Sequence, residues 1–302
     1  MNNKTKIMLG LSALTAGTLA AGATGTLAWF TTNKTAKATY SKITAKASTA
    51  KIKLTIGKLS DDSFEKDVSN LNEKNEWLDS VSLTGGTNSF TTDLSSGDGK
   101  TFKKPTWASQ AGNEQDVTSL ADVTEAGENY TQFYIELENT GTSPVEVFLN
   151  QDTKITPSNK EENADVALSC WSRAAIIDYG TEAKPTKNSV LTGKETQYVF
   201  ENEGTTTYTA NVSNFVIGLG DDNKLTMGNF AEGIHKVGEF ATMSEASKKE
   251  KPAGYLTQLA ASAKHYYIIS VWLEGTENDN QDIANNGSID VTLGFTGLDK
   301  IA

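Results

Sequence analysis

The sequence predicts an all-β protein: an antiparallel sandwich of jelly-roll or Greek-key type, with long loop insertions and one or two short helices. Its composition suits short strands joined by polar turns, because Thr, Ser and Asn are abundant, Gly reaches 25 and hydrophobic residues make up only 37%. Several segments alternate apolar and polar residues with the period of a half-buried strand, and no β-α-β rhythm appears. The 302 residues could form one large sandwich or two small β-domains.

The chain begins with a predicted signal peptide over residues 1–28. Its start is positively charged, and no charged side chain occurs in residues 7–33. Thr26 and Ala28 provide the small residues that a signal peptidase requires, although a cut near Ala23 stays open. A retained membrane anchor is the alternative, but Gly and Thr dilute the second half of the segment. We therefore expect a secreted protein of the extracellular matrix or cell surface, with signal peptidase as a partner during export and no stable membrane span after cleavage.

The body of the chain opens with an alternating strand at 50–56, whose apolar face is Ile52, Leu54 and Ile56. Residues 133–137 and 145–149 also alternate, and the turn at 139–142 predicts that they form a hairpin. The longer run at 166–179 is almost continuously apolar, which is typical of a central strand buried on both faces.

The second half continues with a run at 206–219, for which we expect a core of Val212, Phe215 and Ile217. Residues 267–273 and 289–295 carry the clearest alternation and predict a strand pair that closes a sheet.

Two interruptions indicate short helices. Thr242 and Glu245 form a capping box, and Tyr255 to Ala261 could add another turn or two. The polar stretches that we interpret as long surface loops or insertions are 59–75, 93–124 and 158–163.

Charge and cysteine content exclude several classes of protein. The net charge of −11 and a single arginine, Arg173, disfavour binding to nucleic acid or anionic membranes. Cys170 stands alone, so no intrachain disulfide can form, and its apolar surroundings predict a small buried hydrophobe. An exported chain without disulfides depends on its core, on a metal or on assembly with copies of itself.

No catalytic motif is present, and we do not expect an enzyme. His235 and His265 do not form a zinc motif, and no serine elbow, phosphate loop or dinucleotide fingerprint occurs. Carboxylates are plentiful, but no pair lies in an apolar context that favours glycosidase chemistry. No cofactor is expected except calcium as a weaker alternative to a solvated loop, with candidate ligands Glu274, Glu277, Asp279 and Asp282.

Two stretches resemble the TasA/camelysin family of secreted proteins, whose leaders are cut by a SipW-type signal peptidase. The first joins the leader end 25–30 to Ala38-Thr39-Tyr40-Ser41 and to the strand around 52–54. The second, Ser270-Val271-Trp272-Leu273-Glu274-Gly275-Thr276-Glu277 with the closing strand 287–296, is similar to a C-terminal pattern of proteins with such leaders.

The resemblance implies a jelly-roll core and, for the TasA branch, extracellular fibres of a biofilm matrix in which an N-terminal segment of one subunit adds a strand to the next. In that interpretation, 29–49 is an extended donor segment and 50–302 is the sandwich domain with insertions. Trp29, Phe30 and Tyr40 are the expected anchors.

Two further functions remain open. A secreted adhesin that binds carbohydrate or a host surface would use exposed loop aromatics such as Trp77 or Trp107. The camelysin branch implies a metallopeptidase, but no zinc motif in this chain supports that activity.

Overall fold

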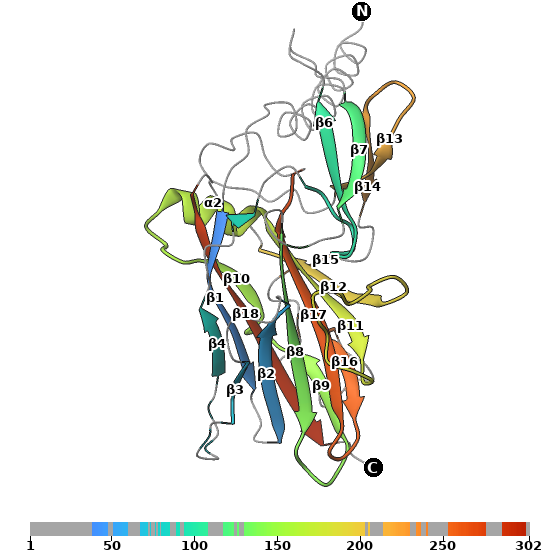
Figure 1. The fold of residues 1–302 in the computed structure, drawn as a ribbon. Coiled ribbons are helices and arrows are strands. Elements are labelled where there is room, and N and C mark those ends of the chain that lie inside the picture. The colour runs from blue at the N-terminus through green and yellow to red at the C-terminus, as the bar shows by residue number, and fades with distance from the viewer. Residues whose placement is uncertain are drawn as a thin grey trace, which may run out of the picture.

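The protein is a sandwich of two β-sheets with two β-hairpins at one end (Figure 1). The computed structural model describes residues 38–47, 51–59, 67–71, 80–84, 89–90, 94–107, 117–123, 130–202, 214–229, 234–236, 253–275 and 286–299, with single positions at 73, 76, 78, 126, 205 and 240. The all-β sandwich that the sequence predicts is confirmed. The predicted helix at Thr242 lies outside the described residues.

Sheet I has the strand order β16-β9-β18-β1-β4, with β10 beside β18 and β5 beside β1. Its strands are β1 (Ala38–Ala47), β4 (Ser80–Thr84), β5 (Ser89–Phe90), β9 (Val145–Leu149), β10 (Lys154–Pro157), β16 (Tyr255–Leu259) and β18 (Ser288–Asp299). The pairing departs from a purely antiparallel sheet at one central place, because β1 runs parallel to β18.

Sheet II has the order β15-β12-β11-β17-β8-β2-β3. Its strands are β2 (Ile52–Lys58), β3 (Val68–Ser69), β8 (Thr131–Asn139), β11 (Ser172–Gly180), β12 (Glu195–Glu201), β15 (Ile234–Lys236) and β17 (Lys264–Leu273). The hairpins outside both sheets are β6 (Phe102–Trp107) with β7 (Val117–Val123), and β13 (Asn214–Leu219) with β14 (Leu225–Asn229).

The main core lies between the two sheets, and it contains the apolar residues that the alternation assigns to it. Sheet II contributes Ile52, Leu54 and Ile56 of β2, together with alternate residues of β17. Sheet I contributes Ile289, Val291 and Leu293 of β18, among others. Period-two alternation therefore identifies correctly which residues of β2, β17 and β18 face this core.

Two predicted strand pairings are wrong. The segment 133–137 lies in β8 of sheet II, whereas 145–149 is β9 of sheet I, so the turn between them crosses the sandwich and does not make a hairpin. In the same way, β17 and β18 belong to different sheets. The physical reason is that two strands facing one core from opposite sides show the same alternation as two strands paired in one sheet.

The run 166–179 is also not a single strand. It begins within the helix α2 (Asn163–Trp171) and continues as β11. A continuous apolar run fits a buried helix as well as a buried strand, and α2 packs against β10 and β18. Cys170 is buried in this helix, as expected. The helical turn predicted at Tyr255 is instead the strand β16.

The core expected in 206–219 is shifted by one residue. Val216 is buried, whereas Phe215 is half-buried and Ile217 is 49% exposed, and Val212 lies outside the described residues. A register irregularity between Val216 and Gly218 accompanies this change of face.

The segment 94–107, which we call the cover segment, is not the surface loop that its polarity predicts. Its first part, up to Phe102, contacts the outer face of sheet II, where a second hydrophobic core forms, and the rest continues as β6. The buried members of this core are Leu94, Phe102, Tyr130, Ala175, Val199 and Trp272. The ring of Phe102 stacks on Tyr130 at 3.9 Å and meets Trp272 edge-on at 5.4 Å. Part of sheet II, at β11, β12 and β17, is therefore covered by apolar side chains on both faces.

Candidate functional site

A buried ionic cluster lies where the cover segment meets sheet II. Its centre is Arg173 of β11, which is opposite Trp272 of β17 on one side and Glu201 of β12 on the other. The side chain of Arg173 is fully buried. A guanidinium in this position cannot lose its charge, so it requires compensating carboxylates.

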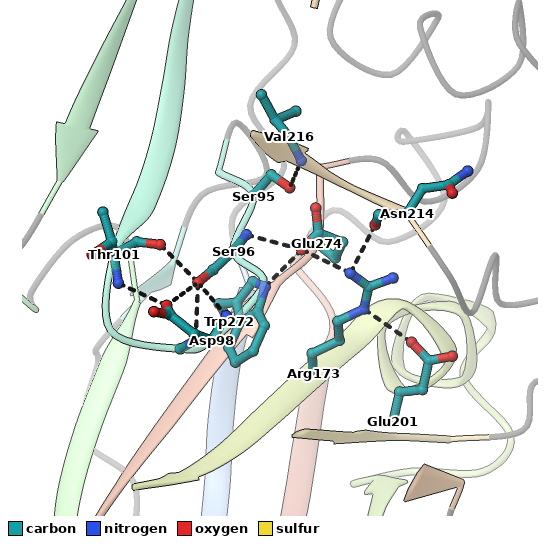
Figure 2. Close-up of polar contacts among 11 residues, drawn as sticks. Ser95, Ser96, Asp98, Thr101, Arg173, Glu201, Asn214, Val216, Trp272 and Glu274 are labelled. Atoms are coloured by element: carbon teal, nitrogen blue, oxygen red, sulfur yellow. Dashed lines mark hydrogen bonds and ion pairs between the residues drawn. The ribbon is translucent and has the colours of Figure 1, made fainter. Parts of the chain in front are cut away.

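Two buried carboxylates provide that compensation (Figure 2). Arg173 Nε donates to Glu201 Oε2 at 2.9 Å. Arg173 Nη1 lies 3.0 Å from Glu274 Oε2 and also donates to the main-chain oxygen of Asn214 at 3.0 Å. The one arginine thus joins β12, the start of β13 and the end of β17.

Glu274 is held by more than the arginine. Its Oε2 accepts hydrogen bonds from Trp272 Nε1 at 2.9 Å and from the amide of Ser96 at 3.2 Å. The main chain beside it pairs with the cover segment, because Gly275 N–H donates to Leu94 O at 2.7 Å. Three N–H donors on one oxygen form an environment for an anion.

The cover segment is itself ordered by short side chains (Figure 2). Ser95 Oγ accepts the amide of Val216 at 2.9 Å, which attaches β13. Ser96 Oγ accepts from Gly99 N–H at 2.9 Å and donates to Thr101 O at 2.8 Å. Gly99 has a φ of +66°, and a Cβ there would lie 2.3 Å from Ala175 Cβ, so only glycine allows this close approach.

This arrangement is suited to holding elements of the fold together. Its charged groups are buried and paired with one another or with N–H donors. Within the described ranges, no group of three or more His, Cys, Asp or Glu could hold a metal ion. In the same ranges, no helix combines the length and apolar character that a membrane crossing requires.

The structure describes only one of the four predicted calcium ligands. Glu274 is bound to Arg173 and the N–H donors above, while Glu277, Asp279 and Asp282 lie outside the described residues. The calcium site therefore stays a prediction. Of the two histidines, His265 is the second residue of β17 and contacts Asp178 Oδ1 through Nε2 at 2.7 Å. The other, His235, is part of β15.

The candidate assembly element is β1, which lies within the predicted donor segment 29–49. It lies between β18 and β4, with parallel pairs to β18 from Thr39↔Ser288 to Ala47↔Phe295. Its other side pairs antiparallel with β4, where Thr44 Oγ1 lies 3.0 Å from Ser82 Oγ. Thr44 and Ala45 of β1 are buried small residues.

Of the three predicted anchors, only Tyr40 lies among the described residues. Tyr40 belongs to β1 and is opposite Ile289, next to a register irregularity. Trp29 and Phe30 lie outside the described residues, as do Trp77 and the side chain of Trp107.

Sequence reasoning missed the ionic cluster and the cover segment. The available signal was Arg173 itself, because a charged residue inside an apolar run needs a buried partner. The flanking Leu94 and Phe102 were the corresponding signal for the cover segment. Comparison of the chain with protein-family models, curated proteins and solved structures found no match.

Proposed function

We propose that this chain is a secreted structural protein that self-assembles into extracellular fibres or a surface or biofilm matrix. Subunits would be joined when the N-terminal strand of one copy adds to the sheet of the next. The observation that supports this proposal is the placement of β1 in a slot of sheet I between β18 and β4.

The slot suits strand exchange for a physical reason. Main-chain hydrogen bonds hold an added strand, and they do not depend on which copy donates it. A second copy has the same β1 sequence, so it fits the same register against β18. Small buried residues such as Ala45 also require no large pocket to open.

An empty slot would raise the free energy of the folded protein. Without β1, the edge of β18 would expose unpaired N–H and C=O groups beside a core strand that carries Ile289, Val291 and Leu293. Either the chain's own β1 or that of a neighbour must therefore fill the slot. In the proposed assembly, Trp29 and Phe30 at the new N-terminus and Tyr40 in β1 anchor the donor.

The test combines three measurements on protein recovered from the culture medium of expressing cells. N-terminal sequencing should find a chain that begins after Ala28, and negative-stain microscopy with light scattering should find fibres. A tenfold excess of a peptide with the sequence of residues 38–47 should cap the slot and suppress fibre growth. A scrambled peptide of the same composition is the control. Protein that stays monomeric at every concentration would disprove the proposal.

A further inference from the structure

The β16 edge of sheet I is closed by side chains from the other sheet. In the described part of the chain, β9 is the only strand that pairs with β16, so β16 ends the sheet. An edge strand normally presents free N–H and C=O groups, which attract strands from other molecules.

Tyr198 of β12 takes the place of a neighbouring strand at this edge. Its hydroxyl donates to Tyr255 O at 2.9 Å and accepts from Gly254 N–H at 3.2 Å. One hydroxyl thus satisfies both a donor and an acceptor, as an adjacent main chain would. Burial raises the pKa of Tyr198, although the hydrogen bond from Gly254 lowers it, so the hydroxyl keeps its proton and can donate at neutral pH.

Gln197 extends the closure by one residue. Its Nε2 donates to Leu256 O at 3.2 Å and to Asp178 Oδ2 at 3.2 Å. Adjacent strand residues normally point to opposite faces, but here both Gln197 and Tyr198 reach β16. The β-bulge in β12 explains this, because the pairing with β11 passes from Tyr198 to Thr196 and omits Gln197.

The strand that receives these bonds is irregular at the same point. Tyr255 pairs with Phe148 and Thr257 with Val147, so Leu256 is an extra residue in β16. A bulge at an edge further discourages the addition of a regular strand. The ring of Tyr198 is fixed by an edge-on contact with Phe240 at 5.8 Å.

The same type of closure occurs in sheet II. Beyond the two-residue strand β3, the side chain of Asn70 pairs with β2 as a strand would. Its Oδ1 accepts Leu54 N–H at 2.8 Å, and its Nδ2 donates to Ile52 O at 3.2 Å. Side-chain closure therefore recurs at separate edges of the sandwich.

We propose that Gln197 and Tyr198 determine where a partner strand can add to this protein, by closing the β16 edge of sheet I to a second copy. That these two residues direct assembly rests on the proposed function. By closing the β16 edge, they would confine strand addition to the slot of β1. The closure of the edge is a separate, directly measurable property.

The experiment uses the full chain with Tyr198→Phe, with Gln197→Leu and with both changes. Tyr198→Phe keeps the ring and removes only the hydroxyl. This single variant therefore still tests whether side chains close the β16 edge if the double variant does not fold. Gln258→Leu is the matched control, because Gln258 is an exposed residue of β16 and the change adds apolar surface without removing a closing bond. Hydrogen exchange at Gly254 should become about fivefold faster in Tyr198→Phe and stay unchanged in the control.

Sedimentation velocity should give the double variant an association constant for edge-to-edge assembly at least about fivefold above that of the parent chain and of Gln258→Leu. An excess of the 38–47 peptide should not suppress this association, since the peptide occupies a different slot. Unchanged exchange at Gly254, or faster exchange without added association, would overturn the inference. A parent chain that forms no fibres contradicts the proposed function alone, since the comparison between variants still tests the edge.

Discussion

At the scale of single residues, Arg173 shows why arginine is required at this position. Its planar guanidinium donates from Nε to Glu201 and from Nη1 to Glu274, which come from different elements. A lysine ammonium at the end of a flexible stem has no such fixed fork, and it is more strongly hydrated. Three buried ionic side chains in one cluster are costly to desolvate, so their contribution to the stability of the fold depends on every partner being present.

We predict that Arg173→Met destabilises the protein by about 3–5 kcal/mol, because it leaves Glu201 and Glu274 buried without a countercharge. The triple variant with Glu201→Gln and Glu274→Gln should recover a large part of this loss, since no uncompensated charge then remains. Urea unfolding followed by tryptophan fluorescence measures both free energies of unfolding.

The control is Lys184→Met, which breaks a pair with Asp67 whose side chains are 49% and 37% exposed. That variant should change the free energy of unfolding by less than about 1 kcal/mol. If Arg173→Met were as mild as the control, the cluster would not contribute to stability as its burial indicates.

At the scale of elements, the cover segment should behave as a unit with its own stability. We predict that Phe102→Ala destabilises the second core by about 3–5 kcal/mol, because Phe102 is the ring that contacts both Tyr130 and Trp272. Amide hydrogen exchange should accelerate at Ser95 and Lys103, whose main chains are paired with each other.

The main core is the internal reference for this variant. The amide of Leu54, which donates to Asn70, should keep its protection if the cover segment opens locally. Equal loss of protection at Leu54 and Lys103 would show instead that the two cores unfold together.

Much of the fold could be predicted from the sequence, but the connections between its elements could not. Alternation located the residues of β2, β17 and β18 that face the main core, because successive side chains of a strand point to opposite faces, although the other face of β17 is buried too. Alternation contains no information on which strand lies alongside. The pairing of β1 with β18 joins opposite ends of the sequence, and no local signal predicts it.

The candidate site was harder still to predict. Residues 94–101 contain Ser, Gly and Asp in the composition of a turn, yet Leu94, Ser95 and Ser96 are buried. Their burial depends on Ala175 and Trp272, which are distant in the chain. Arg173 carried the clearest local signal, because its charge contradicts the apolar run around it.

At the scale of the whole molecule, the first described strand and the last are neighbours in sheet I. The proposed exchange of β1 between copies would be opposed by the net charge of −11, because identical acidic chains repel one another.

We therefore predict that assembly depends on salt. Raising the ionic strength from about 0.01 M to 0.15 M shortens the screening length from about 30 Å to 8 Å, so repulsion between subunits weakens while main-chain pairing of β1 is little affected. Fibre growth followed by light scattering should speed up several-fold over this range. Sucrose, which is uncharged, is the control for crowding and exclusion effects and should not reproduce the salt response. Growth that slows with salt would mean that attraction between opposite charges joins the subunits, and the slot of β1 would then not be the dominant contact.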